Sequence, residues 1–238
     1  MKDAGTYSQN LAHLLQEICE VHRAEPPTPQ DPVTQLIAGF LQWNAPRRSA
    51  VAALGRICRA MVDHNELRVS HEHEIVALLG SNYPYAQERS ARMREALQET
   101  FVREYAVSLD SLAERSKRDV RAYLASLPGI TPYVTAYVTL VSFKGHAVPV
   151  DDRLAELLRS ENVVGPNATL EQITSFLEHH IRANTTLQMH ASLQDWVDAG
   201  SQRVSLRCET RGTAASGRTL TNATRTKSRR SRTKNPAK

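Results

Sequence analysis

Apolar residues recur along this chain every three to four positions, which is the spacing of residues on one face of an α-helix. In residues 7–23, for example, Leu11, Leu14 and Ile18 share a face. No stretch alternates between apolar and polar residues for long enough to form a sheet, and no internal repeat is found. The pattern predicts an all-α protein, with helices over about 7–23, 32–45, 47–63, 71–79, 86–105, 109–114, 117–126, 132–143, 151–160, 169–182 and 187–199.

Prolines and aspartates mark several of the helix boundaries. Asp31 precedes Pro32, which predicts a capped helix start, and Pro46 interrupts that helix. Further along, the "LPG" of residues 127–129 predicts a tight turn between two helices. The "VPVD" of residues 148–151 then leads into another helix, with an acid at its start.

Charge is distributed unevenly along the chain. Residues 205–238 hold ten of the 30 Lys and Arg residues and one of the 25 acidic residues, so this segment carries +9 and residues 1–204 carry −4. The segment is also almost devoid of apolar residues, so burial cannot offset the entropy cost of ordering it. We therefore expect a disordered basic tail, which either binds the phosphates of nucleic acid or only solubilises the protein.

Composition excludes several classes of protein. Apolar residues make up 41% of the chain and aromatic residues 5%, which predicts a core of Leu, Val, Ile and Ala. No apolar run approaches the roughly 18 residues of a membrane span, and the first residues lack the pattern of a secretory signal. Three cysteines (Cys19, Cys58 and Cys208) are too few for a disulfide framework or a four-cysteine metal site. We expect a cytoplasmic protein, nucleoid-associated if prokaryotic, without membrane contact or a bound metal ion.

The turn and the acid occur in the order and at the spacing found in the helix-hairpin-helix DNA glycosylases, the superfamily of endonuclease III. The family pattern is an LPGVG turn, a helix, and an aspartate after a hydrophobic pair, and residues 127–151 resemble it without a gap. "LIAGFLQWNAPRRSA", residues 36–50, is also similar to the family's LLIAVLLSAQATD helix. The resemblance covers about residues 30–200.

The resemblance implies how the chain is divided. We expect one endonuclease III-like helical domain over residues 1–204. Within it, residues 30–148 form a central subdomain that carries the hairpin at 127–133. Residues 1–29 and 149–204 form a second subdomain, with a cleft between the two.

The resemblance also implies a DNA-binding turn and a catalytic acid. A tight turn followed by a helix start points backbone N–H groups at a DNA phosphate, which assigns DNA contact to Gly129, Ile130 and Thr131. Asp151 would stand at the edge of a pocket for an everted nucleotide. Its carboxylate would stabilise the positive charge that develops on the sugar as the glycosidic bond breaks.

The segment at residues 36–50 supplies further candidates. Asn44 falls where endonuclease III has a glutamine that can enter the space left by the flipped base. Trp43 beside it could stack on a base, and Arg47 could contact phosphate. The glutamate that adenine-mismatch glycosylases use on this helix is replaced by Ala38, which argues against adenine excision by that route.

Three departures from the family pattern restrict the expected chemistry. Tyr133 stands where bifunctional members carry the lysine nucleophile, and a tyrosine cannot form the Schiff base needed for strand cleavage. Monofunctional mismatch glycosylases also carry a tyrosine here, so the resemblance keeps base excision and makes Tyr133 a candidate catalytic residue together with Asp151. Thr131 replaces the second glycine of the turn, where a β-branched residue is penalised at positive φ, so we expect a reshaped hairpin with weaker phosphate binding. The four-cysteine iron–sulfur loop is missing, so we expect no cluster and no other cofactor.

Each candidate also has a purely structural interpretation. Asp151 could serve only as a helix N-cap, and Tyr133 could be a core residue. Trp43 could be buried beside Pro46, and Arg47 could belong to a solvated helix face.

Three functions are therefore compared. The first is a monofunctional DNA glycosylase that hydrolyses the N-glycosidic bond of a damaged or mismatched base. The alternative is a catalytically inactive helix-hairpin-helix DNA-binding protein, and the third is a helical interaction protein whose basic tail alone binds nucleic acid. For the first two we expect double-stranded DNA as the partner and a monomeric protein.

Overall fold

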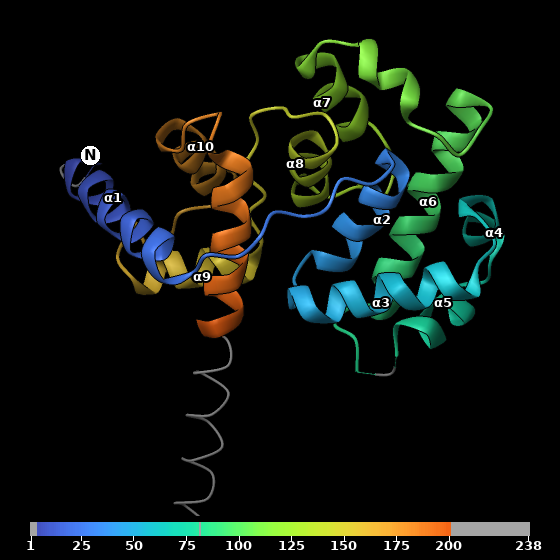
Figure 1. The fold of residues 1–238 in the computed structure, drawn as a ribbon, viewed down its shortest axis with the longest axis horizontal. Helices are drawn as coiled ribbons and strands as arrows, with labels where there is room; N and C mark the ends of the chain where they lie inside the picture. The colour runs from blue at the N-terminus through green and yellow to red at the C-terminus, as the bar shows by residue number, and fades with distance from the viewer. Residues whose placement is uncertain (1–3, 81, 201–238) are drawn as a thin grey trace, which may run out of the picture. The chain divides into compact units, whose positions relative to one another are not determined.

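The computed structural model describes residues 4–80 and 82–200. Every regular element in these ranges is helical, so the predicted all-α class is confirmed. The elements are α1 (Ala4–Val21), α2 (Pro32–Gln42), α3 (Arg47–Ala60), α4 (His64–Val69), α5 (Glu72–Leu79), α6 (Ala86–Glu104), the 3₁₀ helix η1 (Asp110–Glu114), α7 (Lys117–Ala125), α8 (Pro132–Val141), α9 (Asp152–Ser160) and α10 (Leu170–His180). A further helix, orange in Figure 1, covers residues 186–200. The predicted basic tail at 205–238 lies outside the described residues.

The sequence pattern missed one helix, α4. Residues 47–63 were expected to form a single helix, but α3 ends at Ala60 and α4 begins after Asp63. The Asp63 carboxylate accepts the backbone N–H of Glu66 at 2.8 Å and so caps the new helix. An aspartate followed three residues later by a glutamate is a helix-start signal, and it was present in the sequence.

Buried apolar side chains form two clusters. The first cluster joins side chains from α2 to α8, and the second joins side chains from α1, α9, α10 and the helix at 186–200. In Figure 1 these two sets of helices lie next to each other, with the segment after α1 crossing from one to the other. Among the described residues, no helix is both long and apolar enough to cross a membrane.

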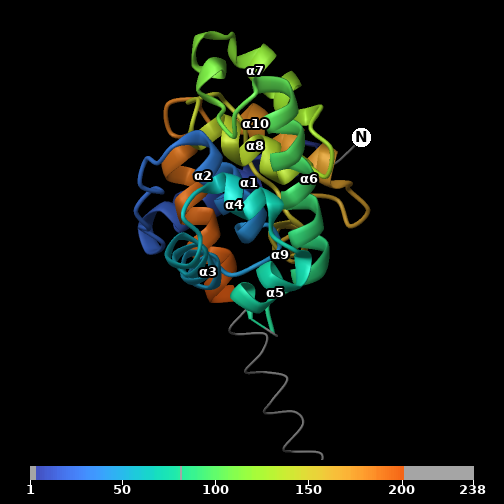
Figure 2. The same ribbon diagram turned by 90° about the vertical axis from the view of Figure 1, so that its right-hand side faces the viewer.

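Helix α8 is almost wholly buried in the first cluster. All of its residues from Tyr133 to Leu140 are buried. Helix α8 packs against α2 and α7. Figures 1 and 2 both show α8 close to α2. Gly39 of α2 permits this packing, because a Cβ atom there would lie only 3.0 Å from Cδ1 of Tyr137.

A buried arginine fixes the end of α2. Arg89 of α6 is fully buried, and its Nη2 donates to the backbone carbonyl of Trp43 at 2.7 Å and to that of Pro84 at 3.1 Å. Tyr83 donates its hydroxyl to the carbonyl of Leu41 at 2.6 Å. These bonds satisfy carbonyl groups that the helix end leaves without a partner. They tie the segment before α6 to the last turn of α2.

Candidate functional site

The predicted hairpin is a tight turn between α7 and α8. Gly129 has φ +72°, and a Cβ atom there would lie 2.7 Å from the backbone oxygen of Arg92. Only glycine combines this backbone conformation with such a close approach. Arg92 in turn donates from its Nη1 to the carbonyl of Gly129 at 3.2 Å, so α6 supports the turn.

Thr131 does not strain the hairpin. Its φ is −104° and its ψ is 156°, an extended conformation that any residue adopts. The expectation that a β-branched residue would be forced to positive φ here is therefore wrong. Thr131 is the N-cap of α8, where its hydroxyl accepts the backbone N–H of Val134 at 3.3 Å, and the half-buried Ile130 packs against the first apolar cluster.

Asp151 is the N-cap of α9 and is bound from two directions. Its Oδ1 accepts the backbone N–H of Leu154 at 2.9 Å, within its own helix. Its Oδ2 accepts the backbone N–H of Asn44 at 3.1 Å, from the end of α2. The side chain is only 1% exposed. Asp151 therefore joins the two sets of helices in addition to starting α9.

Asn44 makes a reciprocal contact with the start of α9. Its Nδ2 donates to the Asp152 carboxylate at 2.8 Å, and its Oδ1 accepts the backbone N–H of Asp152 at 3.1 Å. Asn44 adopts φ +50°, a conformation that asparagine tolerates better than most residues. Asn44 and Asp151, two of the site residues expected from the sequence, are thus in direct contact.

Tyr133 lies beside Asp151 in the first turn of α8. Its side chain is 2% exposed, and its hydroxyl has no hydrogen-bond partner within the described part of the chain. Burial raises the pKa of Tyr133 well above its usual range, and the nearby Asp151 carboxylate raises it further. Tyr133 is therefore a neutral phenol, close enough to the acid to be influenced by its charge.

Burial also raises the pKa of the Asp151 carboxyl group. The backbone N–H groups of Leu154 and Asn44 and the charge of Arg153 act in the opposite direction, but burial is the larger effect. Arg153 itself donates to the Asp198 carboxylate at 2.6 Å. A carboxyl group that is buried and bound by two backbone donors is shielded from water in the described conformation.

Trp43 forms the outer part of the same corner. It is half-buried, follows α2 directly, and has the guanidinium of Arg92 5.6 Å from the centre of its ring. Since Arg92 also binds the carbonyl of Gly129, Trp43 is connected to the hairpin turn. The predicted residues Gly129, Trp43, Asn44 and Asp151 therefore form one connected series of contacts.

Arg47 is engaged within the protein. Its backbone N–H donates to the Asp198 carboxylate at 2.9 Å, and its guanidinium donates to the carbonyl of Glu25 at 2.8 Å. The side chain also lines a cavity of about 310 Å³, between α2, α3 and the segment before α2. Phosphate contact by Arg47 stays a prediction, because the guanidinium is already bound to a carbonyl oxygen here.

This cavity adjoins the buried acid through two stacked tyrosines. Tyr137 lines the cavity, and its ring stacks on that of Tyr133 with the centroids 6.3 Å apart. Tyr137 also donates its hydroxyl to the Gln35 side chain at 3.2 Å. The volume is near the lower limit of small-molecule pockets, at about 300 Å³.

The sequence pattern gave no role to the helix at 186–200, which also contributes to this region. His190 contacts the Tyr137 ring edge-on at 5.6 Å between centroids, and burial lowers the pKa of His190 to about 3, with a smaller contribution from Arg47. Gln194 is 1% exposed, and Asp198 binds Arg47. The spacing of these three residues, four apart, was a signal in the sequence that they share one helix face.

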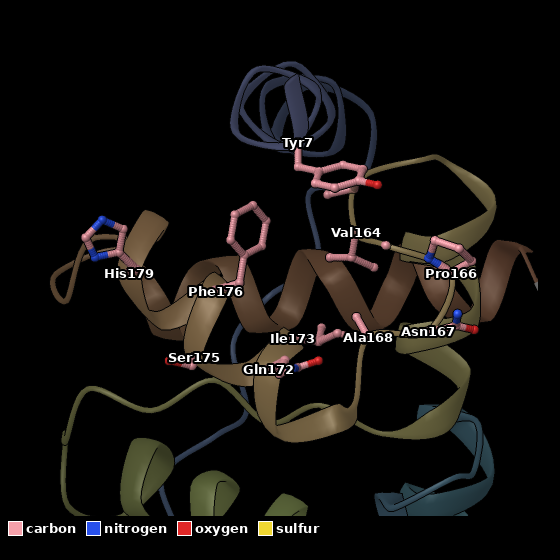
Figure 3. Close-up of a pocket in the computed structure, with 12 residues that line it drawn as sticks. Tyr7, Val164, Pro166, Asn167, Ala168, Gln172, Ile173, Ser175, Phe176 and His179 are labelled. Atoms are coloured by element: carbon pink, nitrogen blue, oxygen red, sulfur yellow. The ribbon is translucent and has the colours of Figure 1, made fainter. Parts of the chain in front are cut away.

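A larger cavity, of about 750 Å³, lies elsewhere, between α1, α10 and residues 163–168. Figure 3 shows Tyr7 of α1 above Val164, with Phe176 and Pro166 also at the cavity. Its lining contains neither Asp151 nor any residue bound to it. We therefore do not assign the chemistry of the buried acid to this cavity.

Comparison with solved structures identifies the fold. A DNA complex of endonuclease III superposes with a TM-score of 0.62 at 14% identity and covers 79% of this chain and 84% of its own. A thermostable thymine-DNA glycosylase gives 0.58 at 15% identity, covering 82% and 88%. The 3-methyladenine DNA glycosylase of H. pylori gives 0.60 at 12% identity, covering 82% and 97%. The fold is that of the helix-hairpin-helix DNA glycosylases.

The similarity is confined to three-dimensional structure. No family model matches the chain, and no curated protein matches its sequence. At 12–15% identity the comparisons establish the fold alone, so the roles of Asp151 and Tyr133 stay predictions.

The described residues do not fit an iron–sulfur cluster or another metal centre. Cys19 and Cys58 are both exposed, one on α1 and the other on α3. The third cysteine, Cys208, lies outside the described residues, and three thiolates cannot supply four ligands. Within the described ranges, no group of three or more His, Cys, Asp or Glu side chains is placed to hold a metal ion.

Proposed function

We propose that this protein is a monofunctional DNA N-glycosylase that excises a damaged or mismatched base from double-stranded DNA. The observation that carries the proposal is the position of the Asp151 carboxyl group. In a fold shared with DNA glycosylases, it lies at the N-terminus of α9, against Asn44 and beside Tyr133.

The chemistry proposed for Asp151 is electrostatic. Hydrolysis of an N-glycosidic bond passes through a sugar with oxocarbenium character, and a fixed carboxylate stabilises that positive charge. In the described conformation the carboxylate is 1% exposed and bound to the backbone of Asn44. DNA binding must therefore move Asn44 away from Asp151 before the sugar can reach the acid.

The proposed enzyme has no strand-cleaving activity of its own. That activity requires an amine, and Tyr133 offers a buried phenol in the first turn of α8. Lys144, the nearest lysine along the chain after this helix, is exposed beyond the C-terminal end of α8. The base would leave by hydrolysis, with an abasic site as product.

The hairpin turn is the proposed DNA-backbone contact. Backbone N–H groups at the turn and at the start of α8 suit a phosphate, since a helix N-terminus carries partial positive charge. Thr131 adopts an ordinary extended conformation, so backbone strain at this residue does not oppose a phosphate contact. We propose that a single copy of the chain binds one duplex.

A catalytically inactive DNA-binding protein is the second candidate. It is favoured by the same contacts, because both oxygens of Asp151 accept backbone N–H groups and the side chain is buried. A residue so fully used as a helix cap and as a link between two sets of helices needs no catalytic role.

An excision assay on full-length protein separates the two candidates. Duplexes with uracil, alkylated or oxidised bases would be incubated with the protein and then cleaved by alkali at any abasic site. The proposed enzyme produces cleavage that falls by at least about two orders of magnitude in Asp151→Asn, as expected when one preorganised electrostatic group is lost. DNA binding without excision of any of these bases would support the inactive alternative.

Asp31→Asn is a matched control for this assay. Asp31 is also a helix N-cap, and its carboxylate accepts the backbone N–H groups of Val33 and Thr34. It starts α2, so it lies at the end of this helix opposite to Asn44. Asparagine still caps a helix, so equal loss of activity in Asp31→Asn and Asp151→Asn would show that the defect comes from a change at a helix start and not from the missing charge at position 151.

A further inference from the structure

A third cavity lies between α3, the end of α5 and the segment before α6. Its volume is about 600 Å³. Helix α3 forms one wall with residues at positions 48, 49, 52 and 56, and the other wall consists of residues 77–80 and 82–84. The cavity shares no lining residue with those of about 310 and 750 Å³, so it is a separate feature of the surface.

Two arginines and no acid line this cavity. Arg48, Ala52 and Arg56 follow one another at a spacing of four, so they lie along one face of α3. None of the described residues that line the cavity is an aspartate or a glutamate. Residues 1–204 carry a net charge of −4, so this absence of acids is unusual for the folded part of the chain. The cavity therefore attracts anions, although the chain around it has an excess of negative charge.

Arg48 is free to bind a ligand. Its side chain is exposed, and it makes no hydrogen bond or ion pair with any other residue that the structure describes. Two other arginines of this region are already bound, because Arg47 donates to the carbonyl of Glu25 and Arg92 pairs with Glu88. Arg48 keeps all of its guanidinium donors for a partner outside the chain.

Arg56 is held in a fixed orientation beside it. Its Nε and Nη2 donate to the carbonyls of Leu78 and Leu79 at the end of α5. These bonds leave Nη1 without a hydrogen-bond partner among the described residues. Ser49 and Asn82 also line the cavity and add a hydroxyl and a carboxamide as donors. Guanidinium, hydroxyl and carboxamide groups are the donors that proteins use for phosphate oxygens of nucleic acid.

The cavity is connected to the candidate site through one of its walls. Pro84 lines the cavity, and Arg89 donates to the carbonyls of both Pro84 and Trp43. On the other side of Trp43, Arg92 lies near the indole ring and donates to the carbonyl of Gly129. In this series of contacts, Trp43 stands between the hairpin turn and the cavity.

This position suits the second strand of a duplex. The hairpin turn and Asp151 are the proposed contacts of the strand that carries the damaged base, and neither of them lines the cavity. In B-DNA the two backbones are separated by grooves of about 6 and 12 Å. Two phosphate-binding sites on opposite sides of one corner can therefore each hold one backbone.

We propose that Arg48 and Arg56 bind a backbone phosphate of the DNA strand opposite to the strand that carries the damaged base. The inference deepens the proposed function, on which it rests, by naming residues that make the protein bind a duplex in preference to a single strand. The contact carries no sequence information, because every nucleotide presents the same phosphate. It therefore serves any base pair.

The first test measures how DNA affinity depends on salt. Full-length protein would be bound to two DNAs with the same stable abasic-site analogue, one single-stranded and one paired with an undamaged complement. Arg48→Gln should lower the slope of log affinity against log salt by about 0.9 for the duplex, the equivalent of one phosphate contact. For the single strand, Arg48→Gln should have the same slope as wild type.

Arg59→Gln is the matched control. Arg59 is also an exposed arginine of α3, but it does not line the cavity. Both variants lose one positive charge, so a general electrostatic effect would lower the two slopes equally. The proposal predicts wild-type binding for Arg59→Gln. Thermal unfolding should be nearly unchanged in both variants, because neither replacement touches a buried group.

Uncharged methylphosphonate linkages identify the strand that is bound. In the undamaged strand opposite the analogue, they should lower the slope for wild-type protein by about 0.9 more than for Arg48→Gln, because the variant has already lost this contact. In the strand that carries the analogue, they should lower both slopes equally.

Four outcomes would overturn the proposal. Arg48→Gln could bind the duplex as wild type does, weaken duplex and single strand equally, or match Arg59→Gln in its effect. The fourth is a methylphosphonate effect that depends on Arg48 only in the strand with the analogue. No base is excised in these measurements, so their result is independent of whether Asp151 is catalytic.

Discussion

Asp151 accepts the backbone N–H of Asn44 at 3.1 Å, although 107 residues separate the two in the sequence. The contact joins the N-terminus of α9 to the end of α2. Together with the two bonds between the Asn44 side chain and Asp152, it makes this corner a structural link as well as the candidate site.

Replacing Asn44 should destabilise the protein through this link. Asn44→Gly keeps a residue suited to φ +50° but loses both side-chain bonds, and we expect it to lower the free energy of unfolding by about 1–3 kcal/mol. Asn44→Ala should lower the free energy of unfolding by about 1 kcal/mol more than Asn44→Gly, because alanine tolerates positive φ poorly. Urea denaturation of the two variants measures both effects, and equal stabilities would contradict a role for the backbone conformation.

Gly129→Ala should disrupt the hairpin turn. The new Cβ atom would lie 2.7 Å from the Arg92 backbone oxygen, and the backbone at φ +72° disfavours alanine. We expect a loss of about 2–4 kcal/mol in the free energy of unfolding, combining overpacking with backbone strain. Gly80→Ala is the control, since Gly80 has φ +94° but a Cβ atom there would meet no other atom within 4 Å. It should lose about 1–3 kcal/mol, from backbone strain alone, because φ +94° and ψ 150° form a conformation that is essentially limited to glycine.

His190 should make the protein sensitive to acid. Its pKa is lowered from the ordinary value of 6.5 to about 3. As the pH falls, His190 is therefore protonated in the unfolded chain at a higher pH than in the folded protein. The stability that neutral His190 confers is fully present above pH 6.5 and is lost progressively toward pH 3. The free energy of unfolding should therefore be about 2 kcal/mol lower at pH 5 than at pH 7.

The variant His190→Gln removes this titration. Urea denaturation at pH 7 and pH 5 should show a smaller acid destabilisation in His190→Gln than in wild type. The same replacement at the exposed His13 controls for the loss of a histidine. An unchanged pH dependence in His190→Gln would mean that His190 is protonated in the folded protein at pH 5.

Borohydride should trap no covalent complex between the protein and abasic DNA. Trapping requires an imine, and Tyr133, at the position where bifunctional members carry lysine, is a phenol that cannot form one. The products would be resolved on a denaturing gel beside those of a bifunctional glycosylase. A trapped adduct that disappears in Lys144→Ala would assign a lyase step to that exposed lysine and would contradict the monofunctional proposal.

Residues 205–238 should dominate non-specific DNA affinity, because they carry +9 whereas residues 1–204 carry −4. If half of the ten basic residues engage phosphates, the slope of log affinity against log salt should be about −4 to −5. Truncation after residue 204 should flatten this slope and leave the unfolding midpoint unchanged. A truncated protein with the original slope would place the phosphate contacts on the hairpin and its neighbours.

The sequence by itself determined most of the helices and two local motifs, the "LPG" turn and the helix start at Asp151. The apolar spacing, the prolines and the capping acids predicted most helices, because these signals act through bonds that span three or four residues. Asp151 was recognised as a helix start for the same reason, and its bond to Leu154 is of this local kind. The "LPG" turn was likewise predicted correctly at Gly129.

Only the tertiary structure decided how these elements form a site. The pairing of Asn44 with Asp151 and the complete burial of Arg89 depend on helices far apart in the chain. The stack of Tyr85 on Trp43 depends on the same long-range packing. The prediction of a positive φ at Thr131 was wrong. The family pattern has glycine at this position, but here Thr131 is the N-cap of α8 and adopts an extended conformation. Local hydrogen bonds fix where a helix starts, but burial and packing between distant segments fix which side chains meet.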